Sequence, residues 1–152
     1  MKTLLAPIDF SKSSPNVLQT TRQLATKLGA KVHLLNVREP TEGYIPIGAS
    51  MDLATPPSMV VVDTDDKEIL AQLEDAAKSL RENKIEVTYE VITGLAVEEI
   101  LTQAKEKKID YIILGSHGHG AIFHLFSGSV VTGVLKHAPC PVIVTPHHVE
   151  AN

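Results

Sequence analysis

Residues 111–120 read YIILGSHGHG, an apolar run that passes directly into a glycine-rich segment. Four further runs of similar length recur along the chain, and those at 111–114 and 142–144 are continuously apolar and rich in β-branched side chains. Such runs are typical of strands that are covered on both faces of a sheet. The pattern predicts five strands, at residues 3–8, 31–37, 86–93, 111–115 and 141–145.

Segments with helical periodicity separate these strands. Apolar residues recur at helical spacing over residues 15–28, 66–83, 97–107 and 129–137. Ser14 and Pro15 predict the N-cap and first turn of the first helix, and Gly29 predicts its end. The alternation of strands and helices predicts a doubly wound α/β fold, in which right-handed crossovers build one open parallel sheet with helices on both faces.

The glycine-rich segment extends from Gly115 through Gly118 to Gly128 and Ser129. It begins where the fourth predicted strand ends, and it leads into the fourth helix. Ligands of open α/β sheets bind beside the carboxyl ends of the strands. Glycines let backbone N–H groups approach a phosphate closely, and a helix N-terminus adds unpaired donors and partial positive charge. The segment therefore predicts a loop that binds a polyphosphate.

Two common phosphate-binding motifs are absent from the sequence. No Lys follows a glycine in this loop, which excludes the Walker pattern, and the first strand leads into PIDFS at 7–11 without the glycines of a dinucleotide fingerprint. Ser129 has no identifiable His and Asp to activate it as a nucleophile, so phosphate binding and helix capping are its expected roles. The loop histidines, at 117, 119 and 124, lack the further ligands that a zinc site usually needs and are expected to face phosphate or solvent.

The composition indicates a globular protein without nucleic-acid partners. Its 152 residues suffice for one self-supporting core, with 43% hydrophobic and 21% charged residues. Only 4% of the residues are aromatic, and the formal net charge is −4 at pH 7. Because nucleic-acid binders usually need a basic surface or aromatic stacking platforms, both values argue against that class.

The chain is predicted to form a single domain over residues 1–146, followed by a C-terminal tail at 147–152. The segment 38–65, rich in proline and glycine, is expected to be a mobile surface loop. The single cysteine, Cys140, excludes an internal disulfide framework. Since the first apolar run is far too short for a membrane span, we expect a cytoplasmic location without membrane contact.

Nearly the whole chain resembles the nucleotide-binding branch of the universal stress protein family. The resemblance rests on the spacing Gly115-x2-Gly118-x9-Gly128-Ser129 and on Gly94 after the third strand. It also includes the segments LAPIDFS at 5–11, GAKVHLLNV at 29–37 and HAPCPVIV at 137–144. It implies a five-stranded sheet in the order 3-2-1-4-5, with ATP bound between the ends of the first and fourth strands.

The resemblance also implies a set of nucleotide-binding residues. Asp9 would lie near the sugar and phosphates, and the backbone of Val37 would meet the adenine. The remaining positions would line the site or hold the phosphates at the start of the fourth helix. The full set is Pro7, Asp9, Val37, Gly115, Ser116, His117, Gly118, Gly128, Ser129 and Val130.

Asp9 has a structural alternative, as a turn or capping residue ahead of the first helix. Because the serines at 11, 13 and 14 can cap that helix without it, contact with the ligand is the favoured role. No catalytic residue is implied. Mg²⁺ is expected to be held through the phosphates, close to Asp9, rather than by protein ligands alone.

Family members commonly pair through the last strand, which implies a homodimer that meets at Pro141–Thr145. Many of them carry Arg in the phosphate loop where this chain has His117 or His119. Histidine supplies less charge than arginine and titrates near neutral pH. A preference for AMP or ADP over ATP, or a pH-dependent affinity, is the hypothesis that follows.

Three functional classes remain open from the sequence. The first is a regulatory module of the stress response that binds ATP (or ADP or AMP) and whose bound state an unidentified protein partner reads. The second is a slow ATPase or phosphotransferase in which Asp9 orients water or metal. The third is an interaction module that needs no nucleotide. The absence of a lysine in the phosphate loop, and of a general base other than Asp9, favours the first.

Overall fold

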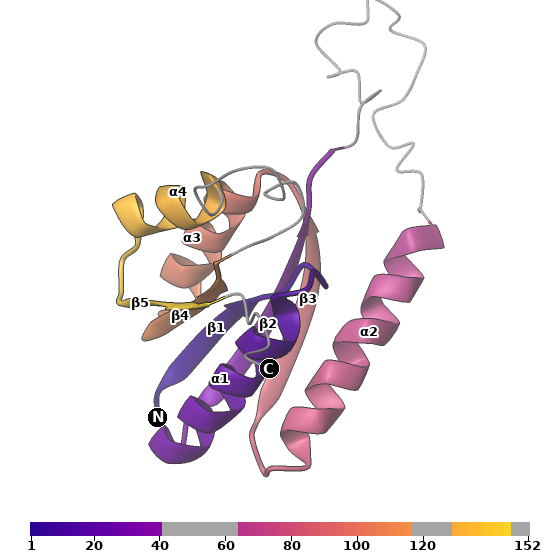
Figure 1. Ribbon diagram of the computed structural model, residues 1–152, viewed down its shortest axis with the longest axis vertical. Coiled ribbons are helices and arrows are strands. Elements are labelled where there is room, and N and C mark those ends of the chain that lie inside the picture. The colour runs from indigo at the N-terminus through magenta and orange to yellow at the C-terminus, as the bar shows by residue number, and fades with distance from the viewer. Residues whose placement is uncertain (41–63, 117–128, 147–152) are drawn as a thin grey trace, which may run out of the picture.

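A five-stranded parallel sheet forms the middle layer of the computed structural model, which describes residues 1–40, 64–116 and 129–146 (Figure 1). Its strands are β1 (Thr3–Pro7), β2 (Lys31–Arg38), β3 (Val87–Thr93), β4 (Tyr111–Gly115) and β5 (Val142–Thr145). They lie in the order β3-β2-β1-β4-β5, and every neighbouring pair is parallel. The predicted fold class and strand order are confirmed.

Four helices connect the strands. They are α1 (Ser14–Leu28), α2 (Thr64–Arg81), α3 (Ala96–Glu106) and α4 (Ser129–His137). All element boundaries lie within two residues of those expected from the sequence. The segment expected to be a mobile loop is shorter at both ends, because β2 extends to Arg38 and α2 begins at Thr64; residues 41–63 and the predicted tail lie outside the described residues.

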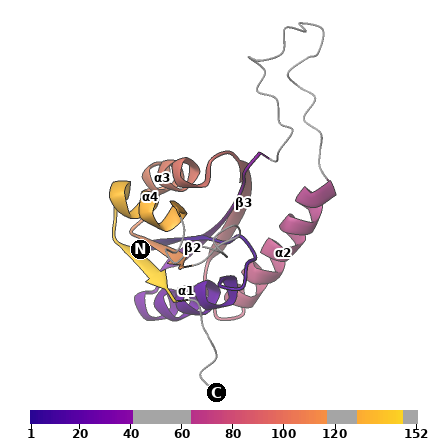
Figure 2. The same cartoon turned by 45° about the horizontal axis from the view of Figure 1, so that its top comes forward.

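The helices cover both faces of the sheet, α1 and α2 on one side and α3 and α4 on the other (Figure 2). Successive side chains of a strand point to opposite faces. Leu4 and Ala6 of β1 therefore join a core cluster with α1 and α2, whereas Leu5 joins a second cluster with α3 and α4. No helix among the described residues is long and apolar enough to cross a bilayer.

The start of α1 differs from the expectation by one residue. Ser13, not Ser14, is the N-cap, with a φ of −85° and no side-chain capping hydrogen bond. Ser14 is the first helical residue, and its hydroxyl donates to Asp9 at 3.3 Å. The helix ends as expected, since Gly29 adopts the left-handed conformation with a φ of 60°.

Candidate functional site

The turn between β1 and α1 is held by the carboxylate of Asp9. Its Oδ1 accepts a hydrogen bond from the backbone N–H of Ser11 at 2.9 Å and one from the Ser14 hydroxyl at 3.3 Å. Phe10 has a φ of 58°, a left-handed conformation that is uncommon for a bulky residue. The turn role considered for Asp9 is therefore present, at the carboxyl end of the central strand.

Gly115 lets the end of β4 approach this turn. A Cβ on Gly115 would lie 2.7 Å from Oγ of Ser13, closer than real side-chain contacts allow. Oγ of Ser13 lies 3.1 Å from Oγ of Ser11, whose N–H donates to Asp9. The end of β4 therefore packs against the turn that carries Asp9, which gives this glycine a packing role besides the phosphate approach expected from the sequence.

Ser116, the first residue after β4, is tied to the edge strand β5. Its backbone N–H donates to the carbonyl oxygen of Thr145 at 2.9 Å, and the Thr145 hydroxyl donates to the carbonyl oxygen of Leu114 at 3.2 Å. Because the amide of Ser116 is used within the sheet, a phosphate contact from this residue would come from its hydroxyl.

The backbone of Val37 is directed toward the side on which β1 lies. In β2, the N–H of Lys31 donates to the β1 side and that of Val32 donates to the β3 side, so odd-numbered residues direct their backbone groups toward β1. The pairing of β1 with β2 ends at Pro7, opposite Leu35. Val37 lies two residues further along, so its N–H and C=O face the region beyond the end of β1.

Ser129 and Val130 form the first turn of α4. Val130 packs against the second core cluster, and Ser129 is exposed. A close contact with α3 fixes the helix, because a Cβ on Gly133 would lie 2.8 Å from Cγ2 of Val97. A helix N-terminus presents unpaired backbone N–H groups and partial positive charge, so this contact helps set where those donors lie.

Half of the predicted site residues lie at the ends of three adjacent strands, β1, β2 and β4. These residues are Pro7, Asp9, Val37, Gly115 and Ser116. Two more, Ser129 and Val130, begin α4. The remaining three, His117, Gly118 and Gly128, lie outside the described residues, as do the other two loop histidines.

Asn36 is a buried residue beside this site that the sequence analysis did not single out. Asn36 is only 5% exposed, and its Nδ2 donates a hydrogen bond to the carbonyl oxygen of Ile8 at 2.8 Å. The hydrogen bond joins β2 to the residue immediately before Asp9. The available signal was an amide side chain in a strand otherwise expected to be buried and apolar.

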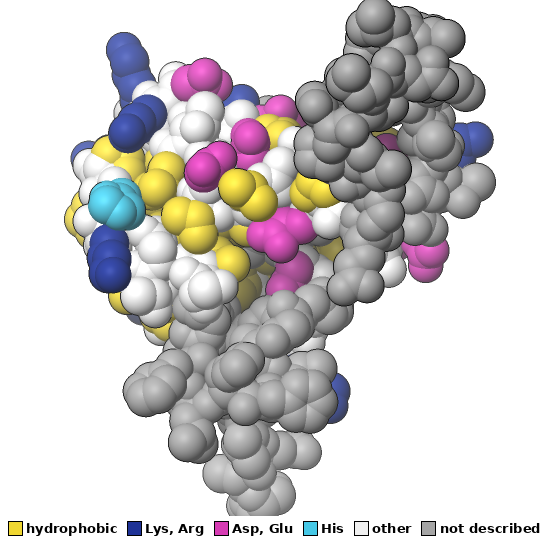
Figure 3. All heavy atoms as spheres, turned by 90° about the horizontal axis from the view of Figure 1, so that it is seen from above, with side chains coloured by type: hydrophobic (Ala, Val, Ile, Leu, Met, Phe, Trp, Pro, Cys, Tyr) yellow, Lys and Arg dark blue, Asp and Glu magenta, His cyan; other side chains and the backbone are white. Residues whose placement is uncertain are grey.

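The side of the molecule on which β2 ends carries acidic and hydrophobic side chains near the middle of its visible surface, with Lys and Arg side chains near the edge (Figure 3). Among residues 1–40, 64–116 and 129–146, no group of three or more His, Cys, Asp or Glu side chains is arranged to hold a metal ion.

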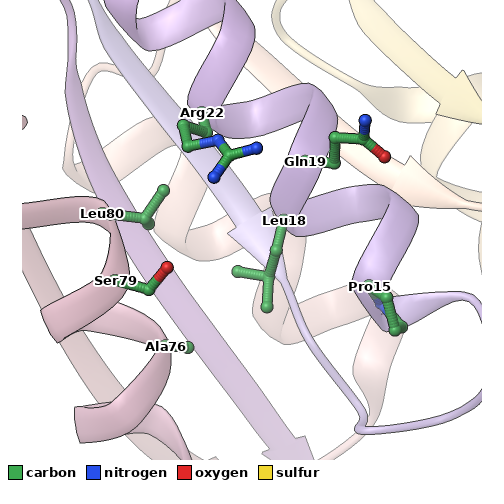
Figure 4. Close-up of a pocket in the computed structure, with 7 residues that line it drawn as sticks. All are labelled: Pro15, Leu18, Gln19, Arg22, Ala76, Ser79 and Leu80. Carbon is green, nitrogen blue, oxygen red and sulfur yellow. The ribbon is translucent and has the colours of Figure 1, made fainter. Parts of the chain in front are cut away.

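A separate groove lies between α1 and α2. Leu18 and Leu80 point into the gap between the two helices, with Arg22 and Ser79 beside them (Figure 4). None of the residues that line this groove belongs to the predicted nucleotide site. It is therefore an alternative location against which the strand-end site can be tested.

The strand order β3-β2-β1-β4-β5 defines a doubly wound α/β protein. Its winding reverses between β1 and β4, the place where proteins of this class bind ligands, and the polar turn of Asp9 lies there. Residues 1–146 match the model of the universal stress protein family. The chain belongs to that family.

Individual relatives agree with this assignment. The chain is 28% identical over 151 residues to universal stress protein MJ0577 of Methanocaldococcus jannaschii, covering 94% of this chain and 93% of that protein. The solved structure of MJ0577 superposes with a TM-score of 0.81 at 26% identity, covering 98% of both chains.

Two solved structures of the family contain nucleotides. A universal stress protein in complex with cAMP superposes with a TM-score of 0.70 at 19% identity, covering 97% of this chain and 98% of that one. A family protein from Arabidopsis thaliana with AMP bound superposes with a TM-score of 0.66 at 18% identity, covering 99% and 95% of the two chains. At these identities the likeness establishes the shared fold.

Proposed function

We propose that this chain is a regulatory protein that binds an adenine nucleotide, ATP or its products ADP and AMP, at the carboxyl ends of β1, β2 and β4. The convergence of three adjacent strand ends on the turn of Asp9 carries the proposal. Open α/β sheets bind ligands where the winding reverses, which here is between β1 and β4. The nucleotides in the two family structures support adenine as the base.

Each part of the nucleotide has a proposed contact. Adenine lies against the backbone N–H and C=O of Val37, and the ribose and first phosphate lie near Asp9. The phosphates extend over Gly115 and the glycine loop to Ser129 and Val130, where the start of α4 supplies backbone donors. Mg²⁺ accompanies the phosphates because hard cations prefer phosphate and carboxylate oxygens.

We further propose that residues 1–146 act as one nucleotide-binding domain and that two chains pair through β5. This strand is an edge of the sheet, and Val144 on it is 38% exposed. An exposed edge strand presents unpaired backbone groups that a second copy can use. Nucleotide binding would then give a dimer that a regulatory protein partner recognises.

Calorimetric titration with AMP, ADP and ATP in the presence of Mg²⁺ tests the nucleotide site. Asp9→Asn is the sharpest variant, because an amide oxygen can still accept the two hydrogen bonds of the turn while the charge is removed. We expect roughly a tenfold loss of affinity or more, as for a charge-assisted hydrogen bond to the ribose. Asp75→Asn, an exposed carboxylate on α2, is the matched control and should bind as the wild type does.

Two glycine variants test the phosphate loop in the same titration. Gly118→Val and Gly128→Val should weaken ATP more than adenosine, because a side chain would keep the phosphates from the backbone. Unaltered ATP affinity in both would contradict the proposed loop. Multiple turnovers of ATP that Asp9→Ala abolishes would identify a phosphohydrolase in place of a binding protein.

The histidines of the loop add a dependence on pH. If His117 or His119 faces the phosphates, ATP should bind more tightly at pH 6 than at pH 8, since the protonated imidazole supplies positive charge. Equal affinities at the two pH values would remove this part of the proposal.

A further inference from the structure

The side chain of Asn36 occupies a backbone position of the β1–β2 ladder. In this ladder the N–H of Lys31 donates to the carbonyl oxygen of Lys2, so each odd-numbered residue of β2 is matched to the carbonyl 29 positions earlier in the chain. The next donor after Leu35 is therefore the N–H of Val37, and its acceptor would be the carbonyl oxygen of Ile8. That oxygen instead accepts a hydrogen bond from Nδ2 of Asn36, at 2.8 Å.

This exchange ends the ladder one step early. The N–H of Ile8 still donates to the carbonyl oxygen of Leu35 at 2.8 Å, so the two strands are in register up to this point. Among the described residues, no hydrogen bond from the Val37 N–H to Ile8 accompanies the side-chain contact. Asn36 thereby satisfies the last carbonyl of the ladder and leaves the Val37 backbone directed past the end of β1.

The same contact holds the turn that follows. Phe10 adopts a φ of 58°, which costs about 1–2 kcal/mol for a residue with a side chain and persists only where neighbouring contacts hold it. The Asn36–Ile8 hydrogen bond holds the chain two residues before Phe10, and the Asp9–Ser11 hydrogen bond joins the residues on either side of it. The position of the Asp9 carboxylate therefore depends on both.

The hydrogen bond to Ile8 orients the side-chain amide of Asn36, and it leaves the amide oxygen without a hydrogen-bond partner among the described residues. Because the Ile8 carbonyl can only accept, the amide must turn its NH₂ group toward it. Within the described residues, Oδ1 is buried and has no hydrogen-bond partner. A buried amide with an unsatisfied oxygen costs stability, so the oxygen does not explain this side chain; the hydrogen bond that Nδ2 donates to the Ile8 carbonyl oxygen is the contact on which a role for Asn36 rests.

We propose that Asn36 is a positioning residue of the nucleotide site: it takes the Ile8 carbonyl oxygen in place of the Val37 N–H, which keeps the Val37 backbone available to adenine and fixes the turn that carries Asp9. This inference rests on the proposed function and adds to it a residue that acts through two others. It makes the end of the β1–β2 ladder a determinant of affinity for the base and ribose.

Asn36→Leu tests the proposal, because leucine has the same number and branching of side-chain heavy atoms and cannot donate a hydrogen bond. With Asn36 replaced, the Val37 N–H can bond to Ile8, so hydrogen exchange at the Val37 amide should slow at least about tenfold. Exchange at the Ser11 amide should become faster as the turn loosens. A purely structural loss would speed exchange at both amides, so the opposite changes are specific to the proposed role.

Binding is measured on the same protein by calorimetric titration with adenosine and AMP. We expect the affinity for both to fall at least about tenfold in Asn36→Leu, whereas Gln103→Leu should bind as the wild type does. Gln103 is the matched control because it is 7% exposed, lies on α3 and also carries a buried amide oxygen without a partner among the described residues.

Asn36→Ala provides a second variant if the leucine side chain prevents folding, as checked by thermal unfolding. Unchanged or faster exchange at Val37, or unchanged adenosine affinity, in a folded Asn36 variant would overturn the inference. A wild-type chain that binds no adenine nucleotide would overturn the proposed function and the role in nucleotide affinity, while the exchange data would still decide whether Asn36 ends the ladder.

Discussion

At the scale of single residues, the proposed nucleotide site depends on groups that hold the backbone more than on groups that would face a ligand. Asp9 accepts the Ser11 N–H and the Ser14 hydroxyl, and Gly115 leaves room for Ser13. These contacts orient the carboxyl ends of two adjacent strands before any ligand is present. Such preorganisation lowers the entropy lost on binding, because the polar groups do not need to be ordered by the nucleotide.

His33 should make the stability of the protein depend on pH. It is 5% exposed, with Nδ1 2.7 Å from Oγ1 of Thr88 and Nε2 2.8 Å from Oε1 of Glu90. Burial lowers the pKa of His33, nearby Lys107 lowers it further, and Glu90 opposes both. The folded state therefore resists a proton that the unfolded state accepts at about pH 6.5, so the free energy of unfolding should fall as the pH drops through that value.

Urea unfolding between pH 7.5 and 5.5 measures this dependence. His33→Gln keeps hydrogen-bonding capacity without titrating in this range, so the decline with falling pH should be smaller in it than in the wild type. His137→Gln changes an exposed histidine and should keep the wild-type decline. Equal pH dependence in wild type and His33→Gln would show that His33 does not contribute.

At the scale of helices and strands, the contact between α3 and α4 sets the position of the α4 N-terminus. Gly133 lies against Val97 so closely that a Cβ would meet Cγ2 at 2.8 Å. The two helices also share the second core cluster, to which Ile100 and Val134 belong. A small shift of α4 would therefore move Ser129, where the phosphates are proposed to bind.

Gly133→Ala should destabilise the protein although alanine favours helices. Helix propensity gains at most about 1 kcal/mol, whereas overpacking a fixed contact costs about 1–3 kcal/mol. The free energy of unfolding from denaturant titration should fall, and ATP affinity should fall with it. Val97→Ala in the same chain removes the clashing methyl groups and should restore part of both. An increase in stability from Gly133→Ala alone would contradict the assigned packing.

The elements were predictable from the sequence because their signals are local. Apolar runs bounded by polar residues indicate buried strands, and Gly29 marks a left-handed helix end. The error at Ser14 has a physical reason: two adjacent serines can each cap a helix, and the contact that distinguishes them is with Asp9, outside the helix.

The candidate site was predictable only in part, because its contacts join residues that lie far apart in the sequence. Asp9, Val37 and Gly115 were assigned through the family resemblance, and the structure places them at adjacent strand ends. Asn36 was not predicted, because its role depends on the Ile8 carbonyl, 28 residues earlier in the chain. No local pattern records that a side chain replaces a backbone donor in a sheet.

At the scale of the whole molecule, the sheet has two edges with different surroundings. The β3 edge is covered by α2 on one face, with Tyr89 and Val91 packed against the core. At the other edge, β5 is a shorter strand than β3, and its Val144 is 38% exposed. The β5 edge is therefore the proposed contact between two chains.

Val144→Lys should convert a dimer into a monomer, since a charge on an edge strand opposes pairing with another chain. Sedimentation equilibrium should give twice the chain mass of 16.4 kDa for the wild type and once that mass for the variant. Leu28→Lys replaces an apolar residue with 45% exposure at the end of α1 and should remain dimeric. A monomeric wild type, or a dimeric Val144→Lys variant, would contradict the proposed pairing.

Binding of an adenine nucleotide at the ends of β1, β2 and β4 is the proposal from which the roles of Asp9, Val37 and Asn36 follow. Titration of the isotopically labelled protein with ATP and Mg²⁺, followed by backbone amide NMR shifts, tests binding and location together. We predict saturable shifts at residues 9–11, 37, 115–116 and 129–130, with one nucleotide per chain. The absence of saturable shifts, or shifts confined to the α1–α2 groove around Arg22 and Leu80, would contradict the proposal.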